Sequence, residues 1–156
     1  MNKKYILTEE YKNIIVSDNQ SKRVFRIMAI RSFGGVKAGQ LGGFVEKEEN
    51  LSHEGDCFVF DDAVVCDDAR VEKNSLVMDN ALIFGNALLT DNAIVVDNAI
   101  LKDRVVVRGD SEITDSAVIS ENAQVLDSAL VSENAAIKDD AKIRNFAIVS
   151  GHVVVK

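Results

Sequence analysis

Cysteine and histidine are scarce in this chain of 156 residues, which has two of each. The spacing of Cys57 and Cys66 fits neither a pair of zinc ligands nor a redox motif. We therefore expect no disulfide framework and a protein of the reducing cytoplasm. The sequence also lacks any run of 18 or more apolar residues, so we expect no membrane-spanning helix.

Signals for export and for phosphate binding are missing as well. The first residues, MNKKYILTEEYKNIIVSD, lack the apolar stretch of a signal peptide. Five glycines lie between Gly34 and Gly43, but neither GxxxxGK[ST] nor GxGxxG is present. We interpret these glycines as turn residues and expect no cofactor.

Charge is divided unevenly along the chain. Residues 1–50 contain nine Lys/Arg and six Asp/Glu, a net charge of +3, whereas residues 51–156 contain nine and nineteen, a net charge of −10. Such an acidic body disfavours direct binding to nucleic acid or to an anionic membrane.

A six-residue repeat starts at Cys57 and never loses its phase. Position one of each hexad is small or Val: Cys57, Ala63, Ala69, Ser75, Ala81, Ala87, Ala93, Ala99, Val105, Ser111, Ala117, Ala123, Ala129, Ala135, Ala141, Ala147, Val153. Position three is always Val, Ile or Leu, from Val59 to Val155. A helix cannot keep this phase, because six residues do not close on a period of 3.6.

A strand can keep it, since positions one and three of a strand point to the same side. Position five is mostly acidic or Gly, and position six is mostly Asn, Asp or Ser. These residue types tolerate left-handed backbone and turn geometry. Each hexad is therefore predicted to be a short strand followed by a corner, stacked in a solenoid whose rungs cover one another.

The repeat of residues 57–156 resembles the hexapeptide-repeat family, whose fold is a left-handed parallel β-helix of triangular section. Three hexads make one coil in that family, which implies an all-β solenoid of nearly six coils. The resemblance, not the repeat itself, implies the left hand, because general crossover rules favour the right hand. This chain departs from the family after the aliphatic position, where bulky residues such as Phe60, Met78 and Phe84 occur.

A second, narrower resemblance covers the lead-in VKAGQLGGFVEKEENLSHEGDCFVFDDA, residues 36–63. It is similar to enterobacterial and prophage hexapeptide-repeat proteins, which carry a transferase label that rests on their fold. Phe44 and Phe58 stand where those proteins usually have Trp, and His53 stands where they have Gln. The resemblance implies a phage-encoded accessory protein.

The N-terminal third has a different pattern. Short apolar, β-prone runs flank the turn signal DNQSK at residues 18–22. We predict a small antiparallel β cap over the first coil, and two domains: a cap with a Gly-rich lead-in at residues 1–50 and the β-helix at 51–156.

Catalytic candidates are few. Hexapeptide acyltransferases typically use a His as general base on a loop excursion or near a subunit junction, and this repeat has no excursion. His53 is the weak candidate, against a structural role in a turn, while His152 occupies a corner position. Carbonic anhydrases of the same fold need three His on one zinc, so we expect no metal.

Two surfaces are candidates for binding. Residues eighteen apart share a wall, and one wall is apolar at the outward positions of its first three coils: Phe58, Phe60, Leu76, Met78, Ile94, Val96. Six such side chains could expose several hundred Å², the size of an interaction site, unless residues 1–50 cover them. One corner carries a file of acidic residues at position five: Asp61, Asp79, Asp97, Asp115, Glu133.

These features predict a non-enzymatic, self-associating scaffold or binding module that forms homo-oligomers. A sharper hypothesis is a phage accessory protein that blocks a basic host protein by acidic charge mimicry. The alternative is an acyltransferase that uses an acyl-CoA-type donor. For the acidic file, a merely solvated corner is the competing explanation, because counter-ions screen surface carboxylates.

Overall fold

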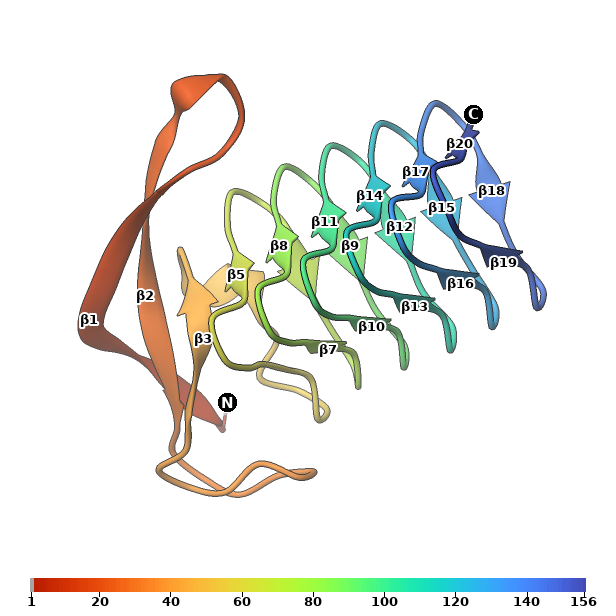
Figure 1. Cartoon of the computed structure of the whole chain (residues 1–156). Coiled ribbons are helices and arrows are strands. Elements are labelled where there is room, and N and C mark those ends of the chain that lie inside the picture. The colour runs from red at the N-terminus through yellow and green to blue at the C-terminus, as the bar shows by residue number, and fades with distance from the viewer. Residues whose placement is uncertain (1) are drawn as a thin grey trace.

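The computed structural model describes residues 2–156 and is almost entirely β-structure (Figure 1). Three longer strands come first: β1 (Tyr5–Ile15), β2 (Ser21–Ala29) and β3 (Leu41–Val45). Two short 3-10 helices, η1 (Ser17–Asn19) and η2 (Glu48–Asn50), follow β1 and β3. The other strands have two residues each: β4 (Phe58–Val59), β5 (Val64–Val65), β6 (Arg70–Val71), β7 (Leu76–Val77), β8 (Leu82–Ile83), β9 (Leu88–Leu89), β10 (Ile94–Val95), β11 (Ile100–Leu101), β12 (Val106–Val107), β13 (Glu112–Ile113), β14 (Val118–Ile119), β15 (Gln124–Val125), β16 (Leu130–Val131), β17 (Ala136–Ile137), β18 (Lys142–Ile143), β19 (Ile148–Val149) and β20 (Val154–Val155).

The short strands form three parallel walls around one axis. The first wall is β4-β7-β10-β13-β16-β19, the second contains β5-β8-β11-β14-β17-β20, and the third is β6-β9-β12-β15-β18. Every pair is offset by one coil, as in Ile94, which pairs with Leu76 before it and Glu112 after it. The chain is therefore a left-handed β-solenoid of about six coils, as the repeat and its family resemblance predict.

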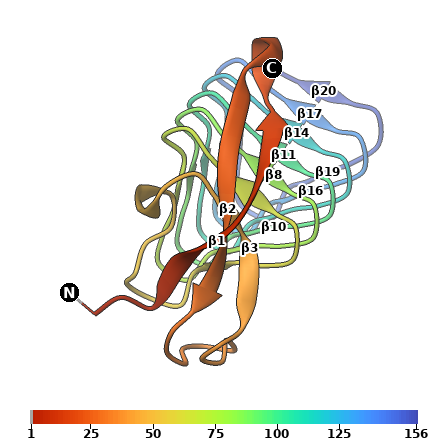
Figure 2. The same ribbon diagram turned by 90° about the vertical axis from the view of Figure 1, so that its left-hand side faces the viewer.

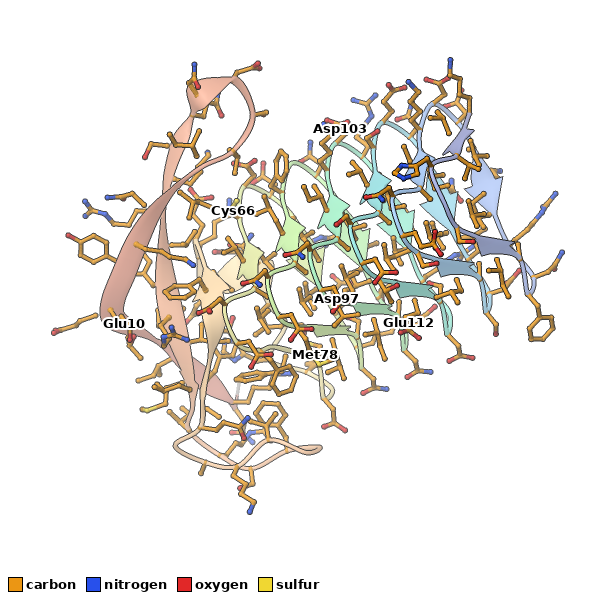
Figure 3. All side chains as sticks on the ribbon, viewed as in Figure 1. Glu10, Cys66, Met78, Asp97, Asp103 and Glu112 are labelled. Carbon is orange, nitrogen blue, oxygen red and sulfur yellow. The ribbon has the colours of Figure 1, made fainter. Side chains whose placement is uncertain are left out.

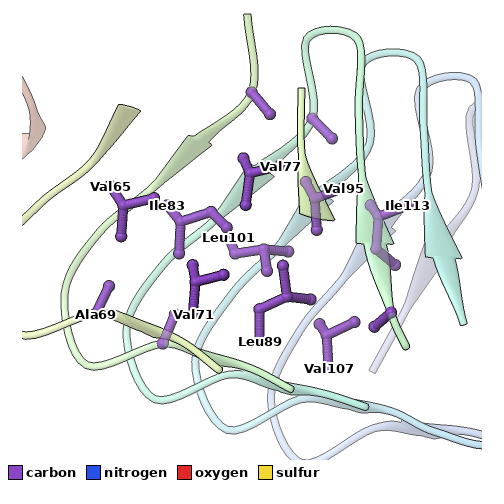
Figure 4. Close-up of a cluster of buried hydrophobic side chains, with 14 of the residues drawn as sticks. Val65, Ala69, Val71, Val77, Ile83, Leu89, Val95, Leu101, Val107 and Ile113 are labelled. Carbon is purple, nitrogen blue, oxygen red and sulfur yellow. The ribbon is translucent and has the colours of Figure 1, made fainter. Parts of the chain in front are cut away.

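Small and aliphatic side chains fill the interior of the prism. Val65, Ile83 and Leu101 follow one another along the second wall, and each is fully buried (Figure 4). Position one must be small because it lies beside the corner, where two walls meet. Ser75 and Ser111 also fit this position, because their hydroxyls donate to the carbonyls of Glu72 and Arg108 at 2.7 and 2.8 Å.

The corners owe their shape to position five. Its non-Gly residues from Asp61 to Asn145 all have positive φ, between 56° and 62°. Asp and Asn adopt this left-handed conformation more readily than most residues, and Gly adopts it freely. The Asp-rich corners of the sequence therefore bend the chain at the end of every strand.

The N-terminal cap is continuous with the second wall. Strands β1 and β2 form an antiparallel hairpin, β2 pairs with β3, and β3 pairs in parallel with β5. The hairpin lies across the first coils (Figure 2), and it buries Val64, Cys66 and Phe84 on the outside of the second wall. Antiparallel strands of the cap are thus confirmed, while the division into two domains at residue 50 stays a prediction.

Glycine allows the cap to approach the first coil closely. A Cβ atom at Gly43 would lie 2.6 Å from the carbonyl oxygen of Ala63 and 2.7 Å from a methyl group of Val59. A side chain at this position would therefore push β3 away from the solenoid. The Gly-rich lead-in has a packing role here.

Candidate functional site

His53 lies in the turn between η2 and β4, where the cap meets the first coil. Its ring stacks on Tyr5, with centroids 4.2 Å apart and planes 17° from parallel. Its Nδ1 atom accepts a hydrogen bond from the backbone N–H of Lys4 at 3.2 Å. Only 8% of the side chain is exposed, so the imidazole is a packed part of the joint between cap and solenoid.

This geometry decides what His53 can do chemically. Because Nδ1 accepts a hydrogen bond, the neutral ring carries its proton on Nε2. Nε2 is buried, has no hydrogen-bond partner among residues 2–156, and lies 3.9 Å from a carboxylate oxygen of Glu48. Burial lowers the pKa of His53. A ring whose free lone pair is already used cannot act as a general base in this arrangement.

Two further side chains complete this joint, and sequence reasoning did not single them out. The Lys4 ammonium is fully buried and donates to the carbonyls of Gly55 and Cys57 at 3.1 and 2.6 Å. The Tyr5 hydroxyl donates to the carbonyls of Leu51 and Glu48 at 2.6 and 2.9 Å. Within the charged segment MNKKY nothing distinguishes Lys4 from Lys3, because only the packing of β1 buries one of them.

Lys4 and Cys57 are a close but unreactive pair. The Lys4 Nζ atom lies 3.4 Å from the Cys57 Sγ atom and 4.6 Å from the centre of the Phe33 ring. Burial lowers the pKa of Lys4 and raises the pKa of Cys57, so the low-dielectric surroundings favour the uncharged form of each group. A buried thiol of this kind is structural, because nucleophilic attack needs an accessible thiolate.

An open hollow of about 300 Å³ lies beside this joint, lined by Glu48, Glu49, Leu51, Ser52, His53 and Glu54. Three of its six lining residues are glutamates, and His53 is also one of them. Within residues 2–156, no three His, Cys, Asp or Glu side chains converge in a way that could hold a metal ion.

The apolar wall is only partly covered. Phe58 is fully buried, with Phe33 of the cap and Phe60 at centroid distances of 5.5 and 5.1 Å. It is therefore not available at the surface. The other five candidates are half-buried and stay on the outside of the first wall: Phe60, Leu76, Met78, Ile94, Val96. The hairpin covers the second wall instead, so these five side chains form what we name the apolar strip.

The acidic file has an architectural role that the sequence pattern did not reveal. Each of the first four carboxylates accepts a hydrogen bond from the backbone N–H of the next acidic residue, one coil further on. The four bonds have lengths of 3.2, 3.3, 3.1 and 2.9 Å and join Asp61, Asp79, Asp97, Asp115 and Glu133 in order. The file is therefore a ladder in which four of the five side chains satisfy a corner N–H group.

The other two corners use the same device. Asp67 accepts from Gly85, and Asp91 accepts from Gly109, each at 3.0 Å. Lys73 lies 3.0 Å from Asp91 and, together with the Gly109 N–H, lowers the pKa of that carboxyl. Asp97 and Asp103 project from different corners (Figure 3), so acidic charge surrounds the solenoid and is not confined to one edge.

Fold and repeat together define a hexapeptide-repeat β-solenoid, consistent with the hexapeptide-repeat family. No protein-family model matches the chain. A stretch of 62 residues is 34% identical to the uncharacterized acetyltransferase YdcK of Escherichia coli (strain K12), covering 38% of this chain and 19% of YdcK. Less than a fifth of YdcK is thus matched.

Within residues 2–156, no helix has the length and apolar character needed to cross a bilayer.

The His53 joint predicts a pH-dependent stability. Burial is the main cause that lowers the pKa of His53 below its ordinary value of 6.5 in the folded state. The positive charges of Lys3, Lys4 and Arg31 lower this pKa further, whereas the negative charge of Glu48 raises it. The unfolded chain takes up the proton as pH falls through 6.5, so stability is full above that pH and declines below it.

His53→Asn keeps a side-chain acceptor for the Lys4 N–H and cannot titrate. We expect the variant to lose less stability than the parent chain between pH 7 and about 5.5, measured by urea unfolding. Parallel pH profiles for the two proteins would contradict this role for His53.

The acidic ladder predicts different effects of Asn and Ala. Asn at positions 79, 97 and 115 keeps an acceptor and tolerates left-handed backbone, so the triple variant should fold and be slightly more stable. The reason is that the variant removes the repulsion between neighbouring carboxylates, which destabilises the parent chain by roughly 1 kcal/mol or less per pair.

Asp97→Ala should lower the free energy of unfolding by about 1 to 2 kcal/mol, because it loses the hydrogen bond to the next coil and strains the left-handed corner. Thermal unfolding checks both, and equal stability of Asp97→Ala and the parent would refute the ladder.

Proposed function

We propose that this chain is a non-enzymatic scaffold that self-associates through the apolar strip of its first wall. The observation that carries this proposal is that the cap buries Val64, Cys66 and Phe84 on the second wall, whereas the five side chains of the strip stay half-buried on the outside of the first wall. Phe60, Leu76, Met78, Ile94 and Val96 are consecutive outward residues of three stacked coils. Contiguous apolar surface of this kind marks interaction sites on monomers of ordinary size.

A second copy of the chain is the occupant that fits the strip best. The wall is a flat sheet face, so two identical walls can lie against each other about a two-fold axis. The strip ends at Glu112 and Thr114, the first polar outward pair along this wall. This polar boundary would limit how far two walls can slide past each other.

Acyl transfer is the second candidate function, and the similarity to YdcK favours it because that protein is named an acetyltransferase. An acyl-CoA-type donor and His53 as base would be required. The hydrogen bond from Lys4 to Nδ1 and the burial of Nε2 argue against this role for His53. A rearranged cap, or a base supplied by another subunit, would be needed for catalysis.

A finer version of the scaffold proposal concerns the partner. Residues 51–140 contain nineteen acidic and six basic residues, a net charge of −13. Acidic corners on every side would attract a basic protein at long range. The prophage resemblance points to a host protein of the cytoplasm, where free Cys57 and Cys66 would stay reduced.

The apolar strip predicts the assembly state. Met78→Lys and Val96→Lys should each weaken self-association, because both would place an unpaired charge in the contact. Val106→Lys changes a half-buried valine on the third wall and is the matched control. Light scattering after gel filtration at micromolar concentration measures the mass. A species of 17.0 kDa for the parent chain would sink the proposal.

The same proposal predicts that acyl-donor binding is absent. Acetyl-coenzyme A should leave the melting temperature unchanged, because a ligand that binds only the native state must raise it by mass action. A rise of several degrees that disappears in His53→Ala would favour the acyltransferase instead.

A further inference from the structure

The connection between β2 and β3 projects beyond the first wall. In Figures 1 and 2 this connection, residues 30–40, forms the lowest part of the molecule, below the first coil. Its Phe33 ring packs edge to face against Phe58, an outward residue of β4, with centroids 5.5 Å apart. We name residues 30–40 the base loop, and it borders the apolar strip at the N-terminal end of the wall.

The base loop is held firmly by the core. Phe33 and Val36 are buried and exchange two backbone hydrogen bonds, of 3.0 and 2.7 Å. The N–H group of Gly39 donates to the carbonyl of Ala29 at 2.8 Å. A molecule that approaches the strip therefore meets a fixed projection.

Only positive charge is present on this projection. Residues 30–40 contain Arg31 and Lys37 and no acidic residue, a net charge of +2. Both residues are exposed, and the Arg31 guanidinium carbon lies 5.7 Å from the centre of the Phe33 ring. Neither residue takes part in an ion pair within residues 2–156.

The opposite end of the apolar strip is acidic. Residues 109–116, which contain β13, include Asp110, Glu112 and Asp115 and no basic residue, a net charge of −3. Glu112 is exposed and has no ion-pair partner within the described chain. The strip thus lies between unpaired positive charge at one end and unpaired negative charge at the other.

One symmetric arrangement brings these two ends together. Strands β4, β7, β10 and β13 follow one another along the first wall. Two strips placed face to face about a two-fold axis that passes between β7 and β10, perpendicular to the solenoid, put β7 of each copy over β10 of the other and β4 over β13. The base loop of each copy then lies beside the acidic end of the other strip. A two-fold axis parallel to the solenoid would set the two base loops against each other, where they would clash and their like charges would repel.

The acidic corners oppose this arrangement only weakly. The files of the two copies run side by side, but the carboxylates of Asp79 and Asp97 are turned along their own file, towards the next N–H group. They flank the contact on its solvent side, where salt screens charges within about 8–10 Å.

From this geometry we propose that the base loop is an interaction surface for a second copy of the chain, in which Arg31 binds Glu112 of that copy. The contact occurs twice across the two-fold axis and fixes the two solenoids antiparallel. It rests on the proposed self-association through the apolar strip and adds the charge pairing that sets its orientation and register.

Charge reversal tests the ionic contact. Arg31→Glu and Glu112→Arg should each raise the dissociation constant of the dimer roughly tenfold at low salt, and the chain with both changes should return to within about threefold of the parent. Arg23→Glu is the matched control, because Arg23 also lies over an aromatic ring, 4.4 Å from the centre of Tyr11, but in the distal hairpin. Light scattering over a concentration series gives the dissociation constant, and circular dichroism checks that each variant is folded.

Cross-linking tests the orientation. A Cβ atom at Gly35 would have nothing within 4 Å, so Gly35→Cys should be tolerated. In a mixture, a short bis-maleimide should join Gly35→Cys chains to Thr114→Cys chains, and it should not join two Gly35→Cys chains. The native Cys57 and Cys66 are fully buried and should not react.

The outcomes separate this inference from the proposed function. Cross-links between two Gly35→Cys chains would overturn the base-loop contact and leave the strip contact standing. Charge reversals without effect on a dimer that Met78→Lys still weakens would do the same. A parent chain of 17.0 kDa, or a dimer that Met78→Lys leaves unchanged, would overturn both.

Discussion

One repeated contact supports the whole molecule: each hexad pairs its backbone with the hexad eighteen residues further on. This pairing requires that the chain turn a corner after every strand and return in register after three corners. The left-handed residues at position five make the turns, and their carboxylates bind the N–H group of the next coil. At most corners an acidic side chain thus both shapes the turn and links successive coils, so the acidity of the body follows partly from the architecture.

The stacking principle also explains where the molecule is vulnerable. A solenoid buries each coil against its neighbours, so both ends must be closed by something that is not a repeat. At the N-terminal end the cap provides this closure, with the buried Lys4, Tyr5 and His53 joining β1 to the first coil. In the last described coil Ile148 and Val154 are exposed.

Function is constrained by the same geometry. Unbroken coils leave no excursion on which a general base could approach a donor, and the His53 ring is committed to Lys4. The similarity to YdcK concerns 38% of this chain and carries a name, not a set of matched catalytic residues. The main surface features of the described coils are the apolar strip and the acidic corners.

Much of the fold was predictable from the sequence because a period of six with alternating burial admits only a strand and a corner. The walls, the interior residues from Val59 to Val155 and the antiparallel cap strands follow from local pattern. Tertiary structure alone decided which wall the hairpin covers, since Cys66 and Met78 are both outward residues of the repeat. It also decided that Phe58 and Lys4 are buried and that the file from Asp61 to Glu133 is a hydrogen-bonded ladder. These facts depend on contacts between residues far apart in the chain, and no local pattern encodes them.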